Sequence, residues 1–99
     1  MEQASAGTSY RFSLTRPGSK PGLLKAVLAL AVKETEIIFG KARLKLEAGY
    51  DVSAAKPVCV IEGGTECGEH LAKLLAGFLI KQVGEFGFRV QRLRNGKGG

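Results

Sequence analysis

The spacing of hydrophobic and polar residues changes several times along the chain, and each change predicts an element of secondary structure. Strict alternation of apolar and polar side chains indicates a strand with one buried face, whereas apolar residues at every third or fourth position indicate a helix. By these criteria we predict strands near residues 10–15, 57–62 and 86–94 and helices over about 20–35 and 65–84.

A long alternation lies between residues 36 and 47. In an extended chain, Ile38, Leu44 and Leu46 would point to one side, because successive side chains of a strand face opposite ways. The other side would be basic, with Lys41, Arg43 and Lys45. This segment therefore predicts a strand at the edge of a sheet that has one buried face and one open, basic face.

Prolines and glycines separate these elements. Residues 16–22 contain two prolines and two glycines, which are typical of a turn. Thr65 is suited to cap the start of the second helix, and Gly84 is suited to end it. Residues 48–56 are predicted to be a connection between the second and third strands.

The predicted order is strand, helix, strand, strand, helix, strand. This order is similar to the ferredoxin-like βαββαβ sandwich, an α+β architecture in which two helices cover one face of a four-stranded antiparallel sheet. The similarity implies that the fourth, first, third and second strands follow one another across the sheet. We expect residues 9–94 to form a single domain, with flexible tails at 1–8 and 95–99.

Composition narrows the class of protein. The chain has 99 residues and a formal net charge of +6, from 15 basic and 9 acidic residues. It has no apolar run of the ~20 residues that cross a membrane, and its first residues do not form a secretory signal. Its two cysteines suit free thiols better than a disulfide framework. We therefore expect a cytoplasmic protein without a membrane partner.

The positive charge and the open face together favour a polyanionic partner, DNA or RNA, bound through its phosphates. RNA-recognition domains share the element order, but they stack bases on aromatic residues of the third strand, and Val58 to Ile61 contain none. Cys59 and Ile61 are expected near the middle of this face. The candidate nucleic-acid-binding residues, including a basic C-terminal segment, are Arg11, Lys41, Arg43, Lys45, Arg89, Arg92 and Arg94.

The alternative interpretation is a module for protein interaction or homo-oligomeric assembly with no nucleic-acid or catalytic role. An open sheet face or a free edge strand is a common place for subunits to meet. The apolar residues expected at such a contact are Ile37, Phe39, Ile61 and Leu93.

Catalysis is not expected, and neither a cofactor nor a metal is indicated. The one exception that the sequence allows is thiol chemistry at Cys67, because a helix N-terminus favours thiolate and His70 follows three residues later. Cys59 could join these two residues as a third metal ligand, although no closely spaced pair of cysteines supports such a site.

Overall fold

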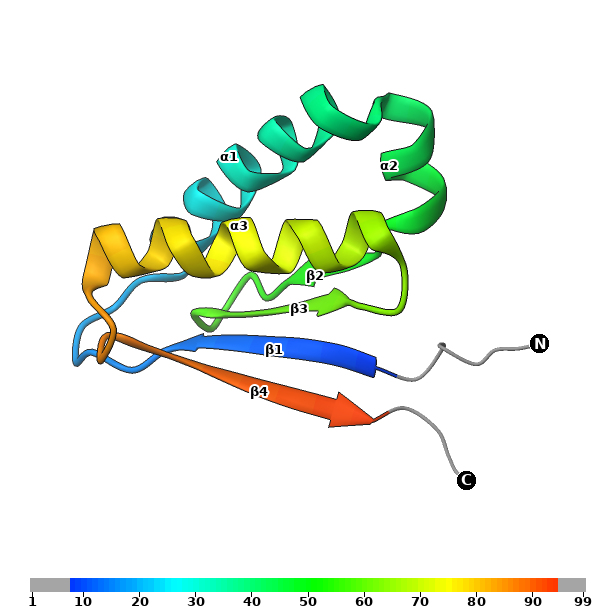
Figure 1. Cartoon of the computed structure of the whole chain (residues 1–99). Helices are drawn as coiled ribbons and strands as arrows, with labels where there is room; N and C mark the ends of the chain where they lie inside the picture. The colour runs from blue at the N-terminus through cyan, green and yellow to red at the C-terminus, as the bar shows by residue number, and fades with distance from the viewer. Residues whose placement is uncertain (1–7, 95–99) are drawn as a thin grey trace.

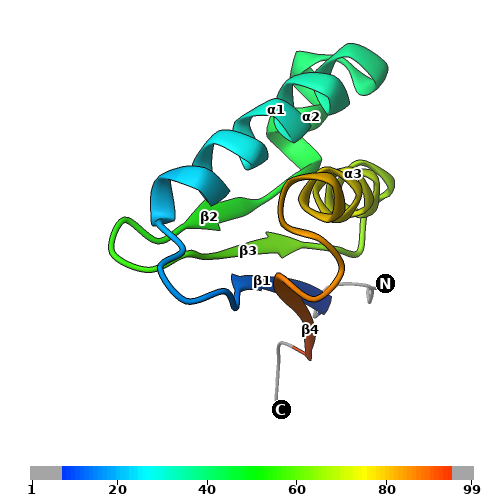
Figure 2. The same cartoon turned by 90° about the vertical axis from the view of Figure 1, so that its left-hand side faces the viewer.

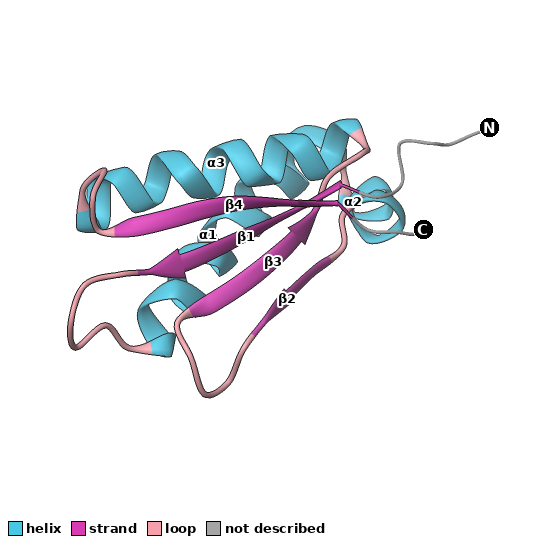
Figure 3. Cartoon of the chain, turned by 90° about the horizontal axis from the view of Figure 1, so that it is seen from below, coloured by secondary structure: helices cyan, strands magenta, loops and turns pink. Residues whose placement is uncertain are grey.

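Three helices lie on the same side of a four-stranded sheet in the computed structural model, which describes residues 8–94 (Figure 1). Seen from the opposite side, the strands stand in front of the helices (Figure 3). In chain order the elements are β1 (Thr8–Leu14), α1 (Pro21–Phe39), α2 (Lys41–Glu47), β2 (Tyr50–Val52), β3 (Val58–Glu62), α3 (Glu66–Val83) and β4 (Phe88–Arg94). Of the tails expected at 1–8 and 95–99, residues 1–7 and 95–99 lie outside the described residues, whereas Thr8 belongs to β1.

The sheet has the strand order β2-β3-β1-β4, and all neighbouring strands are antiparallel. This is the expected order counted from the other edge. The prediction of an α+β chain with a four-stranded antiparallel sheet is confirmed. Two details differ from the prediction. There are three helices instead of two, and the edge strand beside β3 is a different segment from the one predicted.

The segment predicted as an edge strand, residues 36–47, is helical. It forms the last turn of α1 and the whole of α2, and the three-residue strand β2 lies instead within the predicted connection 48–56. The alternation was misleading because Lys, Ala, Arg, Leu and Glu, which make up α2, all have high helix propensity. Only Leu44 of α2 is buried, and one inward position per two turns is compatible with both periods.

Gly40 makes the sharp change of direction between α1 and α2. Its φ of 90° lies in a region that residues with a Cβ rarely adopt, so the chain can leave one helix and enter the next within one residue. Figure 2 shows α1 rising away from the sheet and α2 returning toward it. A single glycine within an alternating pattern gave no reason to predict this corner.

The core lies between the sheet and the two long helices. Phe12, Cys59 and Ile61 point from the central strands toward the helices, and each is at most 1% exposed. α3 packs against them through three fully buried residues, Leu71, Leu75 and Leu79, and α1 contributes Leu24, Leu28 and Ala31.

The expectation that Cys59 and Ile61 lie on the open face is therefore wrong, because the register of β3 is shifted by one residue relative to that expectation.

No helix within residues 8–94 is long and apolar enough to cross a membrane.

Candidate functional site

The face of the sheet turned away from the helices is the first candidate surface. Residues paired across antiparallel strands have their side chains on the same face, so the register fixes its composition. Phe12 is paired with both Cys59 and Val90, and the side chains of all three point toward the helices. The residues that come directly before and after each of them in its strand therefore point away from the helices. The open face carries Ser9, Arg11, Ser13, Asp51, Val58, Val60, Glu62, Arg89, Gln91 and Leu93.

Charge is divided across this face. Arg11 and Arg89 lie on β1 and β4, and Asp51 and Glu62 lie on β2 and β3; all four side chains are exposed. None of the four forms an ion pair with another described residue. Half-buried Val60 lies on a central strand beside Arg11. The open face is thus basic in one half and acidic in the other, and it is not the uniformly basic platform that the sequence predicted.

The seven candidate nucleic-acid-binding residues are not brought together. Arg11 and Arg89 share the open face, but Lys41, Arg43 and Lys45 lie on α2, on the helix side of the sheet. Their separation follows directly from the helical structure of residues 41–47.

Arg92 also lies on the helix side, because it is paired with Tyr10. Its guanidinium carbon is 5.9 Å from the centre of the Tyr10 ring. The Tyr10 hydroxyl donates to the Glu69 carboxylate at 2.8 Å, and this hydrogen bond is the main reason that the pKa of Tyr10 is raised. Arg94 ends β4. Arg92 therefore belongs to a contact between β4, β1 and α3.

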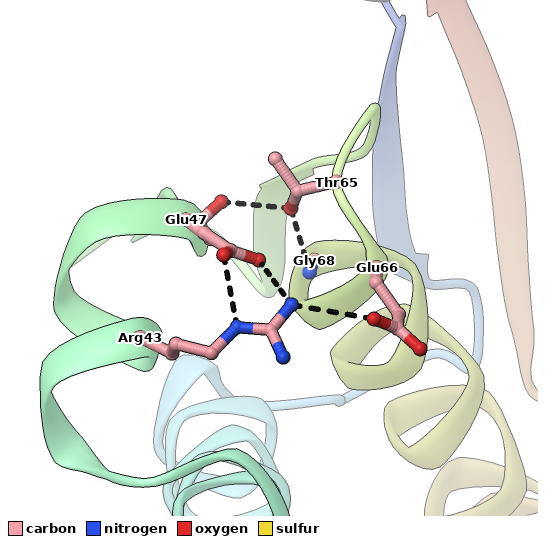
Figure 4. A network of polar contacts seen from close by, with 5 residues as sticks. All are labelled: Arg43, Glu47, Thr65, Glu66 and Gly68. Carbon is pink, nitrogen blue, oxygen red and sulfur yellow. Dashed lines mark hydrogen bonds and ion pairs between the residues drawn. The ribbon is translucent and has the colours of Figure 1, made fainter.

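Arg43 belongs to a network that joins α2 to the start of α3 (Figure 4). Its Nε and Nη2 donate to the two carboxylate oxygens of Glu47 at 2.9 and 3.0 Å, and Nη2 also lies 3.3 Å from the Glu66 carboxylate. These hydrogen bonds raise the pKa of Arg43 and lower that of Glu47. The guanidinium carbon lies 4.9 Å from the centre of the Phe39 ring. Two carboxylates and a ring already engage Arg43, so we do not place it among phosphate-binding residues.

The backbones of α2 and α3 are joined in the same network. The Thr65 hydroxyl donates to the carbonyl oxygen of Glu47 at 2.9 Å and accepts from the Gly68 N–H at 2.9 Å. The hydroxyl therefore satisfies one free carbonyl at the end of α2 and one free N–H at the start of α3. A Cβ at Gly68 would collide with the carbonyl oxygen of Glu62, so glycine is required for this close approach. The prediction of Thr65 as the helix cap is confirmed.

Removal of the Thr65 hydroxyl tests the importance of this junction. We expect Thr65→Ala to lower the free energy of unfolding by about 1–2 kcal/mol, because a helix cap and a second hydrogen bond are lost together. Thr65→Ser, which keeps the hydroxyl, should stay within about 0.5 kcal/mol of the wild type. Urea unfolding followed by circular dichroism measures both values, and equal losses in the two variants would contradict the role given to the hydroxyl.

The thiols are not activated. Cys67 is fully buried, and its pKa is raised by burial first and by the neighbouring Glu47 carboxylate second. Burial raises the pKa of Cys59 to about 12. His70 packs its ring against Phe39, with 5.3 Å between ring centres, and its buried Nε2 has no hydrogen-bond partner among the described residues. Within residues 8–94, no group of three metal-ligating side chains forms, so the structure does not bring Cys59, Cys67 and His70 together as ligands.

A thiol assay tests whether both cysteines are buried and unreactive in the native protein. At pH 8 the native protein should react with Ellman's reagent much more slowly than the protein in guanidinium chloride, because unfolding exposes both thiols and returns their pKa values to about 8.5. The absorbance of the released thiolate gives both rates. A thiol in the native protein that reacts as fast as free cysteine would restore the nucleophile hypothesis.

Three exposed apolar residues were misplaced by the sequence patterns: Ile38 and Leu46, which were expected on a buried face, and Phe86. Phe86 was assigned to the last strand, but it lies in the turn before β4 and is 94% exposed. The Thr15 hydroxyl donates to its carbonyl oxygen at 3.1 Å, so the turn is held against the end of β1. Gly84 and Gly87, which flank Glu85 and Phe86, are the sequence signal for this turn.

Comparison with known proteins gives no family or relative for this chain: no protein-family model matches it, and neither curated proteins nor solved structures give a significant match.

Proposed function

We propose that the chain is an interaction module that pairs with a second copy of itself through the open face of its sheet. The division of charge across that face carries the proposal. Arg11 and Arg89 in one half and Asp51 and Glu62 in the other make the face complementary to itself. The architecture is a variant of the ferredoxin-like sandwich in which α2 lies between the first helix and the second strand.

The symmetry of such a dimer follows from the strand order. When two sheets face each other, a two-fold axis parallel to the strands places β4 of one copy over β2 of the other. The basic half of each copy then lies over the acidic half of its partner. A two-fold axis across the strands would instead place like charges together, which is unfavourable by several kcal/mol. Val58 and Val60 lie on the central strand β3 and supply apolar area to the contact.

Charge reversal in each half provides the test. Arg11→Glu with Arg89→Glu should convert a wild-type dimer into a monomer, because two acidic halves then face each other. Asp51→Lys with Glu62→Lys should do the same. An equimolar mixture of the two double variants should form a dimer with one chain of each, since every contact is again between opposite charges. Light scattering gives the masses, and native mass spectrometry identifies the mixed species.

Lys41→Glu with Lys45→Glu is the matched control. It changes the net charge by the same amount on α2, away from the open face, and should leave the dimer intact. The proposal is wrong if the wild type is monomeric at every attainable concentration, or if the mixture of double variants stays monomeric.

Nucleic-acid binding is a second candidate, and exposed Phe86 is the observation that favours it. Three turns meet at one end of the sheet: the Leu14 N–H donates to the carbonyl oxygen of Pro57 at 2.9 Å, and the Thr15 N–H donates to that of Gly87 at 3.0 Å. These turns and the start of β4 carry exposed Phe86 with the exposed basic residues Arg16, Lys56 and Arg89; Glu85 is the acidic residue there. Bases of single strands stack on exposed aromatic rings beside basic groups.

For this candidate we expect a fluorescein-labelled single-stranded oligonucleotide to bind less tightly as salt rises, because phosphate contacts release counterions. Phe86→Ala should weaken binding by about 1–3 kcal/mol, and Phe86→Trp should preserve it. Fluorescence anisotropy measures both effects. Affinity that does not change with salt, or that is unaffected by Phe86→Ala, would exclude this site.

A further inference from the structure

β2 is the edge strand on one side of the sheet. Within residues 8–94 it pairs with β3 alone, so no other described strand covers this edge. The Glu62 N–H donates to Gly49 O at 2.7 Å, and the Ser53 N–H donates to Val58 O at 2.9 Å, so residues 49 and 53 bond inward. Because bonding direction alternates along an antiparallel strand, Tyr50 and Val52 present their N–H and C=O groups outward. This edge can accept another strand.

The side chains of Tyr50 and Val52 point toward α1, because their partners on β3 are the buried residues Ile61 and Cys59. One side of α1 lies over β2 and carries four residues at helical spacing: Lys25, Ala29, Val32 and Glu36. Two adjoining hollows share Tyr50: one of about 260 Å³ lies between α1 and β2, and one of about 480 Å³ lies beside it, lined mainly by α2 with Glu36 and Ala48. The hollow between α1 and β2 is lined mainly by apolar side chains: Leu28, Ala29, Val32, Tyr50 and Val52, with Lys25.

The ends of this groove are basic. Lys25 lies beside Val52 at one end, and Lys41 and Lys45 line the hollow beyond Tyr50 at the other. Lys45 forms no ion pair with a described residue, and Lys41 lies 3.9 Å from Glu36 while its side chain is 87% exposed. Three lysines face one carboxylate around the groove, so its charge complements an acidic ligand.

We propose that the groove between α1 and β2 binds an extended acidic peptide segment of a partner protein, which adds to the sheet as a fifth strand beside β2. The two peptide residues paired with Tyr50 and Val52 would point into the groove and must be apolar, because they pack against Ala29 and Val32. The residue between them would point to the open face beside Asp51. Glu or Asp beyond the Tyr50 end would meet Lys41 and Lys45. This is recognition by strand addition: the backbone supplies affinity and alternate pockets supply specificity.

A peptide suits this edge better than a second copy of the chain. Two β2 strands paired about a two-fold axis would bring the lysines of the two grooves toward each other, and this repulsion opposes self-pairing. An acidic peptide neutralises the same lysines. The groove is separate from the open face, so its occupation does not depend on the dimer proposed above.

The probe is a set of fluorescein-labelled ten-residue peptides with Val or Ile at two alternate positions and three Glu residues at one end. Control peptides carry the same residues with the two apolar ones adjacent, or Lys in place of Glu. We expect saturable binding of the patterned acidic peptides, measured by anisotropy, and at least tenfold weaker binding of both controls. Hydrogen exchange by NMR should show that the peptide slows exchange at the Tyr50 and Val52 amides.

Ala29→Trp fills the groove from an exposed position of α1 and should weaken binding at least tenfold. Ala26→Trp, also at an exposed position of α1 but outside the groove, is the matched control and should bind as the wild type does. The proposal is overturned if no patterned peptide binds, or if Ala29→Trp binds as tightly as Ala26→Trp. It is also overturned if the Tyr50 and Val52 amides are already protected in the free protein in a concentration-dependent manner, because a second copy would then occupy the edge.

Discussion

The packing of α3 across the central strands is the constraint on which the remaining structure depends. Leu71, Leu75 and Leu79 are fully buried, and they cover Phe12 of β1 and Ile61 of β3. The start of α3, fixed in this way, binds α2 through two hydrogen bonds, one made by Thr65 and one made by Arg43. The position of α2 in turn decides where the chain enters β2. The edge of the sheet and the groove above it are thus placed by contacts that begin in the core.

The helix layer and the sheet divide the charged residues between two environments. Basic residues on α2 enter helix–helix contacts or line the groove beside β2. On the strands, Arg11 and Arg89 lie on the open face, whereas Arg92 lies on the helix side. The formal charge of +6 is therefore distributed over several surfaces, and no single surface carries all of the excess positive charge. For this reason the sign of the net charge says less about the partner than the positions of four residues on the open face, Arg11, Asp51, Glu62 and Arg89.

The sequence predicted the elements whose patterns extend over a full face, and failed at a short helix with a single buried residue. α3 was predicted within a residue or two because its apolar stripe continues for five turns between a threonine cap and a glycine end. The segment of α2 was assigned to a strand because seven residues contain too few buried positions to separate a period of 2 from one of 3.6. That one error moved Lys41, Arg43 and Lys45 to the wrong surface. The split of charge across the sheet could not be foreseen, since it depends on which strands become neighbours and in what register.

The two buried thiols have a further consequence, because they lie at the two junctions on which the fold depends. Cys59 is sealed between the sheet and the helices, so a reagent reaches it only when the core itself separates. Cys67 lies beside Glu47 at the contact between α2 and α3, so a reagent reaches it when that contact separates. Openings of different size have different free energies within one protein. The chain thus contains two native reporters of its own opening motions, one for the core and one for the helical corner.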